Sequence, residues 1–192
     1  MKPILFNTEM VRAILEGRKT VTRRVVKPQY DKDMDGNLHE FSAVENGNKF
    51  VWADQPNIKT LINVPYYPGD ILYVRETWYK DVCRYMFKAN YSDAEKFFRD
   101  GKEVQIKWRP SIHMPKEAAR LFLRVTDVQV ERIKQISAFD AMDEGFEDWK
   151  NFVMFWDKTI KPAEIPLYGW EANPWVWVIE FERCEKLKEG EA

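Results

Sequence analysis

A lysine and a threonine three residues apart are the side chains best suited to covalent chemistry. Segment 17–24 reads GRKTVTRR and brings the Lys19 amine close in sequence to the Thr22 hydroxyl. A hydroxyl is a poor nucleophile until a base removes its proton. Neighbouring cations and burial disfavour the ammonium form of a lysine, whereas the C-terminus of a preceding helix favours it. The spacing fits a Lys–Thr nucleophile pair, and it also fits cations at a helix end followed by a strand.

Glu76 is the second residue with unusual chemical potential. In the strand predicted over 70–78, a period of two places Glu76 on the same face as the apolar Leu72, Val74 and Trp78. A buried carboxylate without a partner costs several kcal/mol, so it must find a cation, accept hydrogen bonds or hold a proton. Two interpretations follow: Glu76 is a general acid, or it forms a structural ion pair with an arginine.

The elements that must position these residues are mostly strands. Short apolar or β-branched runs predict strands over 4–6, 25–26, 70–78, 85–91, 121–130 and 174–183. Helical spacing and capping residues predict helices from Thr8 to Gly17, over 92–100, from Ser137 to Gly145 and over 149–156. Residues 18–24 and 108–115 are expected to be loops. This order predicts the α+β class, as a small mixed β-barrel with helices over its openings.

Length and composition limit the protein to a few classes. The chain has 192 residues, 30 basic and 31 acidic side chains, two cysteines and two histidines. We expect one domain over 1–192, with an inserted hairpin at 29–60 and a helical addition at 147–173. The balanced charge excludes a strongly basic nucleic-acid wrapper. We expect both cysteines to be free thiols, and we expect no bound metal ion, no organic cofactor and no membrane segment. The expected location is the cytoplasm.

Several segments together resemble the ASCH domain family, whose members are small β-barrels related to the PUA RNA-binding fold. Residues 17–24 resemble its GxKxxTxR signature, 69–78 (GDILYVRETW) resembles its GD-x-L-x-V-x-E strand, and 136–146 resembles its "I…A…EGF" helix. The runs TVTRRVVKPQ, WRPSIHMP and NPWVWVIEF also resemble a longer branch encoded by phages and prophages.

The resemblance implies an activity and a set of site residues. A characterised small ASCH enzyme hydrolyses N4-acetylcytidine to cytidine and acetate through a Lys, Thr and Glu triad. Carried onto this chain, the motif implies Lys19 as base, Thr22 as nucleophile and Glu76 as proton donor to the leaving amine. Candidates for contacts to the substrate or to nucleic acid are Arg18, Arg23, Arg24, Arg75, Trp78, Arg109 and His113.

Three functions remain open at this point. The first is a cofactor-free amidohydrolase acting on an N-acylated nucleoside. The second is a module that binds nucleotides or single-stranded RNA without catalysis, using the basic segment 18–27 for phosphates and aromatic rings for bases. The third is an interaction protein whose acidic, aromatic segment 147–173 meets a partner. The sequence leaves the oligomeric state undetermined.

Overall fold

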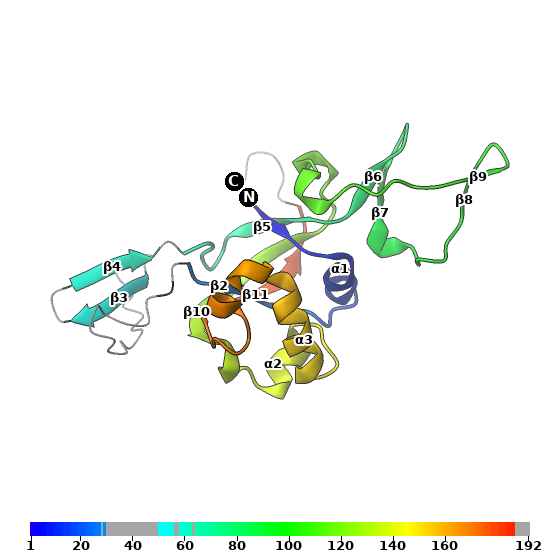
Figure 1. Cartoon of the computed structure of the whole chain (residues 1–192). Coiled ribbons are helices and arrows are strands. Elements are labelled where there is room, and N and C mark those ends of the chain that lie inside the picture. Colours follow the sequence, from blue (N-terminus) through cyan, green and yellow to red (C-terminus); the bar gives the residue numbers. More distant parts are fainter. Residues whose placement is uncertain (28, 30–49, 56–57, 63, 187–192) are drawn as a thin grey trace. The chain divides into compact units, whose positions relative to one another are not determined.

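The structure is a computed structural model that describes residues 1–27, 29, 50–55, 58–62 and 64–186 (Figure 1). The chain divides into two compact units, the first comprising 1–20, 70–124 and 181–192, and the second 21–69 and 125–180. The main sheet has the strand order β1-β5-β10-β11-β2. Its strands are β1 (Lys2–Leu5), β2 (Val21–Val25), β5 (Ile71–Arg75), β10 (Phe122–Arg132) and β11 (Trp175–Cys184). The mixed α+β class is confirmed.

In the first unit, β5 lies between a parallel and an antiparallel neighbour. It pairs in parallel with β1, and residues 122–124 of β10 pair antiparallel with 71–73. The predicted alternation holds, because Leu72, Val74, Glu76 and Trp78 are all buried, although the strand itself ends at Arg75. The buried face predicted from alternation therefore continues beyond Arg75, where β5 ends.

Helix α1 (Thr8–Leu15) also belongs to the first unit, and its N-cap is Asn7, although the sequence suggests Thr8 as the capping residue. The Oδ1 atom of Asn7 accepts a hydrogen bond from the Met10 backbone N–H at 2.8 Å, so Asn7 is the N-cap and Thr8 is the first helical residue. An amide oxygen at this position satisfies an N–H that the first turn leaves free. The buried face consists of Met10, Val11, Ala13 and Ile14.

The remaining elements of the first unit are short. They are β6 (Trp78–Lys80), β7 (Tyr85–Phe87), η1 (Lys88–Asn90), β8 (Phe97–Arg99), β9 (Lys102–Val104), η2 (Ser111–His113) and η3 (Lys116–Ala118). The predicted helix over 92–100 is wrong, because β8 and β9 form an antiparallel hairpin there. Asp100 and Gly101 both have positive φ, 51° and 74°, which suits the tight turn between two strands.

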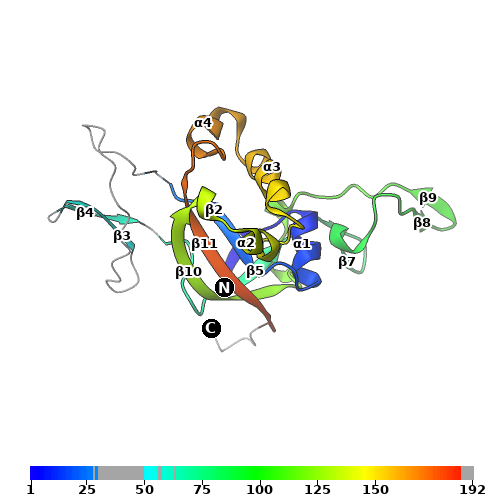
Figure 2. The same cartoon turned by 90° about the horizontal axis from the view of Figure 1, so that it is seen from below.

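The second unit holds the longer helices. Figure 2 shows α2 (Ala138–Asp143) beside α3 (Trp149–Thr159), and η4 (Ile133–Gln135), η5 (Pro162–Glu164) and α4 (Ile165–Tyr168) complete its helical elements. Its core contains Ile133, Ala141, Phe152, Trp156 and Val176. Ser137 and Asp140 form a capping box at the start of α2, which agrees with the helix start predicted at Ser137. None of the helices in the described ranges is long and apolar enough to cross a membrane.

Part of the predicted insertion lies outside the described residues. Within 29–60 the structure describes β3 (Phe50–Gln55), which pairs antiparallel with β4 (Ile58–Ile62). Residues 30–49 are not described. The single domain over 1–192 and the two added segments stay predictions.

Candidate active site

The three residues predicted to carry catalysis are all buried. Among the described residues, the polar or charged side chains with almost no exposure are Lys19, Thr22, Arg23, Glu76 and Glu144. Lys19 and Thr22 are each 2% exposed and Glu76 is 1% exposed. Burying an amine, a hydroxyl or a carboxyl is unfavourable unless partners or a function offset the cost.

The end of α1 fixes the backbone that leads into Lys19. Gly17 has φ 77° and donates its N–H to Ile14 O, while Arg18 donates to Ala13 O at 2.9 Å, which is the Schellman arrangement of a helix end. The Lys19 N–H also reaches Ala13 O, at 3.1 Å. Gly17 is thus required at a left-handed position, and it turns the chain so that Lys19 follows the helix directly.

The Lys19 ammonium nitrogen lies over an aromatic ring of the same unit. Its Nζ atom is 5.6 Å from the centroid of Phe6, and Phe6 in turn contacts Phe181 with centroids 6.1 Å apart. A ring face attracts a cation weakly, and its apolar body also excludes water from the amine. The surroundings of the Lys19 amine therefore include apolar aromatic rings.

Thr22 lies in a strand of the second unit, so the loop predicted over 18–24 is wrong from residue 21 onward. Residues 21–25 form β2, in which Thr22 is the register partner of Ile179 on β11. The β-branched residues Val21, Thr22 and Val25 favour this extended backbone, and the antiparallel partner strand supplies its hydrogen bonds. The Thr22 hydroxyl therefore belongs to a residue in a regular β-strand.

A guanidinium that the sequence interpretation missed holds Glu76. Arg120 Nε donates to Glu76 Oε1 at 2.9 Å, and Arg120 Nη2 donates to Glu76 Oε2 at 3.0 Å. The Glu76 backbone N–H points to Met114 Sδ at 3.3 Å. The structure therefore contains an ion pair between Glu76 and an arginine, and the catalytic role of Glu76 stays a prediction.

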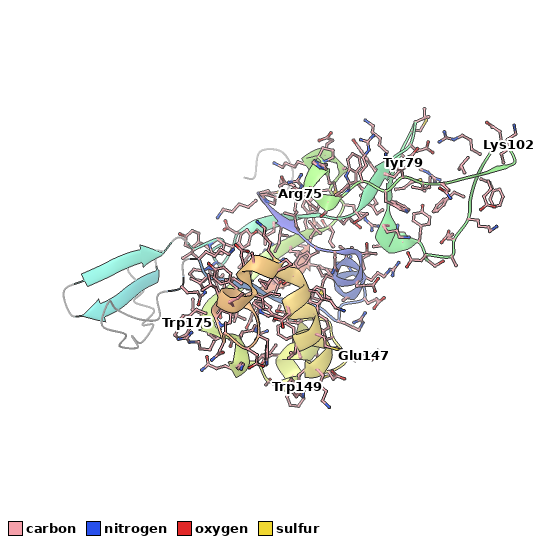
Figure 3. The ribbon with its side chains drawn as sticks, viewed as in Figure 1. Arg75, Tyr79, Lys102, Glu147, Trp149 and Trp175 are labelled. Atoms are coloured by element: carbon pink, nitrogen blue, oxygen red, sulfur yellow. The ribbon has the colours of Figure 1, made fainter. Side chains whose placement is uncertain are left out.

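Arg75, a predicted ligand residue labelled in Figure 3, is the last residue of β5, and its guanidinium binds backbone carbonyl oxygens of the first unit. Its Nε donates to Met114 O at 3.0 Å, and its Nη2 donates to Ile112 O. The guanidinium thereby holds the proline-containing loop 108–115 against the end of β5. His113 in that loop is exposed.

Trp78 and Arg109 form a pair in the same unit. Their backbones exchange hydrogen bonds of 3.1 and 2.7 Å, and the Arg109 guanidinium carbon lies 5.1 Å from the Trp78 ring centroid. Trp78 packs with Phe87 and Met114 in a buried cluster, and its Nε1 atom is buried without a hydrogen-bond partner. The ring is part of the core, and its indole N–H is an unused donor.

The other predicted cations differ in their surroundings. Arg18 is exposed and pairs with Glu16 at 2.5 Å, and Arg24 is exposed on β2. Arg23 is buried, and its guanidinium forms ion pairs with Glu131 at 2.7 Å, Glu144 at 3.5 Å and Asp140 at 3.8 Å. Burial of the Arg24 guanidinium nevertheless lowers the pKa of Arg24, so Arg18 is the member of these three whose charged group is exposed.

The first unit also contains a cavity away from these residues. It has a volume of about 390 Å³ and is lined by 92–97, 103–106, Lys88 and Trp108. None of the predicted site residues lines it. Over the described residues, no group of three or more His, Cys, Asp or Glu side chains could hold a metal ion.

Comparison with known proteins gives one distant likeness. The crystal structure of protein EF3133 from Enterococcus faecalis V583, of family DUF984, is similar with a TM-score of 0.46 and 13% identity. The match covers 100% of this chain and 86% of that chain. No family model and no curated protein matches the chain.

Proposed function

We propose that the chain is an ASCH domain, a small PUA-like barrel, which hydrolyses the amide bond of an N-acylated nucleoside such as N4-acetylcytidine. The observation that carries this proposal is the burial of Lys19, Thr22 and Glu76. Protein interiors seldom contain such groups without a reason. Three of the five buried polar or charged side chains among the described residues coincide with the triad that the motif implies.

The proposed reaction needs no metal ion or organic cofactor. Lys19 removes the proton of the Thr22 hydroxyl, whose oxygen bonds to the acyl carbon of the substrate. The bond between that carbon and the amide nitrogen then breaks, the nitrogen takes up the proton that Lys19 removed from Thr22, and the free nucleoside leaves. Water hydrolyses the acyl-threonine, which releases the carboxylic acid and restores the hydroxyl. Glu76 binds the leaving amine.

The surroundings of each group support its role. The Lys19 side chain is buried, and its Nζ atom lies 5.6 Å from the centroid of the Phe6 ring, so the amine is kept away from bulk water. Thr22 on β2 and Glu76 beside β5 are held by regular structure or by the guanidinium of Arg120. Groups held in place before the substrate binds lose little entropy in the reaction.

The direct test is turnover of N4-acetylcytidine, followed by chromatography of cytidine and acetate. We expect equal amounts of both products from the wild type, and a rate at least about a hundredfold lower for Lys19→Met, because general base catalysis contributes that much or more. Lys2→Met, which removes an exposed lysine paired with Asp70 in the same unit, is the matched control. No product, or equal rates for wild type and Lys19→Met, would remove the proposal.

A second candidate is a nucleotide- or RNA-binding module, and the charge distribution favours it. The first unit contains 19 basic and 14 acidic residues, although the whole chain has a net charge of −1. Binding through phosphates weakens steeply as salt rises. Fluorescence anisotropy with a single-stranded RNA should then show salt-dependent binding by a protein that leaves N4-acetylcytidine intact. Undetectable or salt-independent binding would exclude this candidate.

A further inference from the structure

Arg120 is the residue that binds both carboxylate oxygens of Glu76. Besides the two bonds to the carboxylate, its Nη1 donates to Asn90 Oδ1 at 2.9 Å, and its guanidinium carbon lies 4.2 Å from the centroid of the Phe87 ring. Its side chain is 27% exposed, whereas the Glu76 side chain is 1% exposed. All four residues belong to the first unit.

This arrangement leaves Arg120 little freedom. The planar guanidinium matches both oxygens of a carboxylate, and an aromatic face and an amide oxygen hold the rest of it. A paired cation stabilises the ionised carboxylate relative to the protonated acid. In the free protein, both oxygens of Glu76 act as hydrogen-bond acceptors toward Arg120.

The other charged groups of this region are held elsewhere. Arg75, the neighbour of Glu76 in sequence, binds the carbonyl oxygens of the loop at 112–114. Arg12 binds the carbonyls of Ala89 and Tyr91, and Lys88 pairs with Asp93 at 2.6 Å. Among the contacts described around Glu76, the charge that faces its carboxylate is the guanidinium of Arg120.

We propose that Arg120 is a positioning residue that holds both oxygens of the Glu76 carboxylate, so that Glu76 accepts a hydrogen bond from the amide N–H of the substrate. This inference rests on the proposed function. The proton that the leaving nitrogen needs then comes from Lys19, which carries it after taking it from the Thr22 hydroxyl. The proton count balances within one turnover. Glu76 orients the amide and has no net gain or loss of a proton, in contrast to the donor role that the ASCH resemblance implies.

The two roles of Glu76 predict opposite effects of removing Arg120. If Glu76 must be held as a hydrogen-bond acceptor, Arg120→Gln lowers kcat by about thirtyfold, because the carboxylate loses both of its guanidinium hydrogen bonds. KM changes by less than about threefold, since Arg120 acts through Glu76. If Glu76 were the acid, the same variant would keep or gain activity, because the carboxyl would no longer be tied to a cation.

Three further variants separate positioning from folding. Arg120→Lys keeps the charge without the paired bonds, so we expect a kcat about fivefold below wild type, above that of Arg120→Gln. Asn90→Ala removes an exposed partner of Arg120 and should lower kcat about twofold without changing the fold. Arg12→Gln is the matched control, because Arg12 binds the backbone around the same η1 turn and should leave kcat unchanged.

Each outcome of this series has a distinct meaning. A kcat defect of Arg120→Gln that Arg120→Lys partly restores, with KM nearly unchanged and circular dichroism like wild type, supports the inference. An active wild type with an equally active Arg120→Gln, or a defect of the same size in Arg12→Gln, overturns the inference and leaves the proposed function standing. A wild type without turnover removes both together.

Discussion

At the scale of single residues, the buried guanidinium of Arg23 depends on negatively charged partners. Its guanidinium is 1% exposed and meets three carboxylates of the second unit, those of Glu131, Asp140 and Glu144. Glu144 is itself almost fully buried, at 5% side-chain exposure. Removing one partner of a buried ion pair leaves the other charge in a poor solvent, which costs more than the pair contributes.

We therefore expect Arg23→Leu to lower the free energy of unfolding by about 3–5 kcal/mol. Urea denaturation followed by tryptophan fluorescence measures it. Adding Glu144→Gln to Arg23→Leu should restore part of this loss, because the second change removes the stranded charge. Arg18→Leu, which breaks an exposed pair with Glu16, should cost less than about 1 kcal/mol. A loss that small for Arg23→Leu would show that the buried cluster contributes little.

At the scale of elements, the start of α2 depends on a reciprocal cap. Asp140 N–H donates to Ser137 Oγ at 3.2 Å, and Ser137 N–H donates to Asp140 Oδ2 at 2.8 Å. Burial alone would raise the pKa of the Asp140 carboxyl, but its hydrogen bonds with Ser137 and the charge of Arg23 outweigh this, and the pKa is lowered. The ionised carboxylate is therefore part of the folded helix end.

The lowered pKa of Asp140 gives a stability that depends on pH. Its contribution is complete above the unfolded value of about 3.9 and is lost as the pH falls through the lower folded value. We expect Asp140→Asn to be less stable than wild type at neutral pH and to lose less stability on acidification. Urea midpoints across the acidic range measure this. Parallel pH curves for both proteins would contradict it.

The end of α1 provides a second prediction at this scale. Gly17 has φ 77°, and no atom lies within 4 Å of the position that a Cβ would occupy. Gly17→Ala therefore meets only backbone strain, and we expect a loss of about 1 kcal/mol, with Gly17→Asn losing less. Thermal unfolding of the two variants tests this order. An alanine variant as stable as wild type would show that the left-handed turn is not needed.

Local signals predicted some elements well and failed at others. The alternation in 70–78 identified the buried face that includes Glu76, and Ser137 and Gly17 marked helix ends, because these signals act over a few residues. The helix expected over 92–100 failed because the Asp100-Gly101 turn joins two strands instead. Strand β2 was missed because its partner, β11, lies about 150 residues away in the sequence.

The same limit applies to the candidate site. Lys19, Thr22 and Glu76 could be named from residue type, spacing and alternation, and their burial agrees with that choice. Arg120 could not be named, since it is 44 residues from Glu76 and carries no local signal. The backbone partners of Arg75 could not be named from the sequence either, because they belong to a distant loop.

At the scale of the whole molecule, the account depends on the Thr22 hydroxyl as nucleophile. The most direct measurement is the rate of acetate release from N4-acetylcytidine by Thr22→Val, compared with Thr22→Ser and wild type. Valine keeps the shape of threonine in β2 but has no hydroxyl. We predict a rate at least about a thousandfold below wild type for Thr22→Val, with measurable activity in Thr22→Ser. Equal rates for Thr22→Val and wild type would contradict the account.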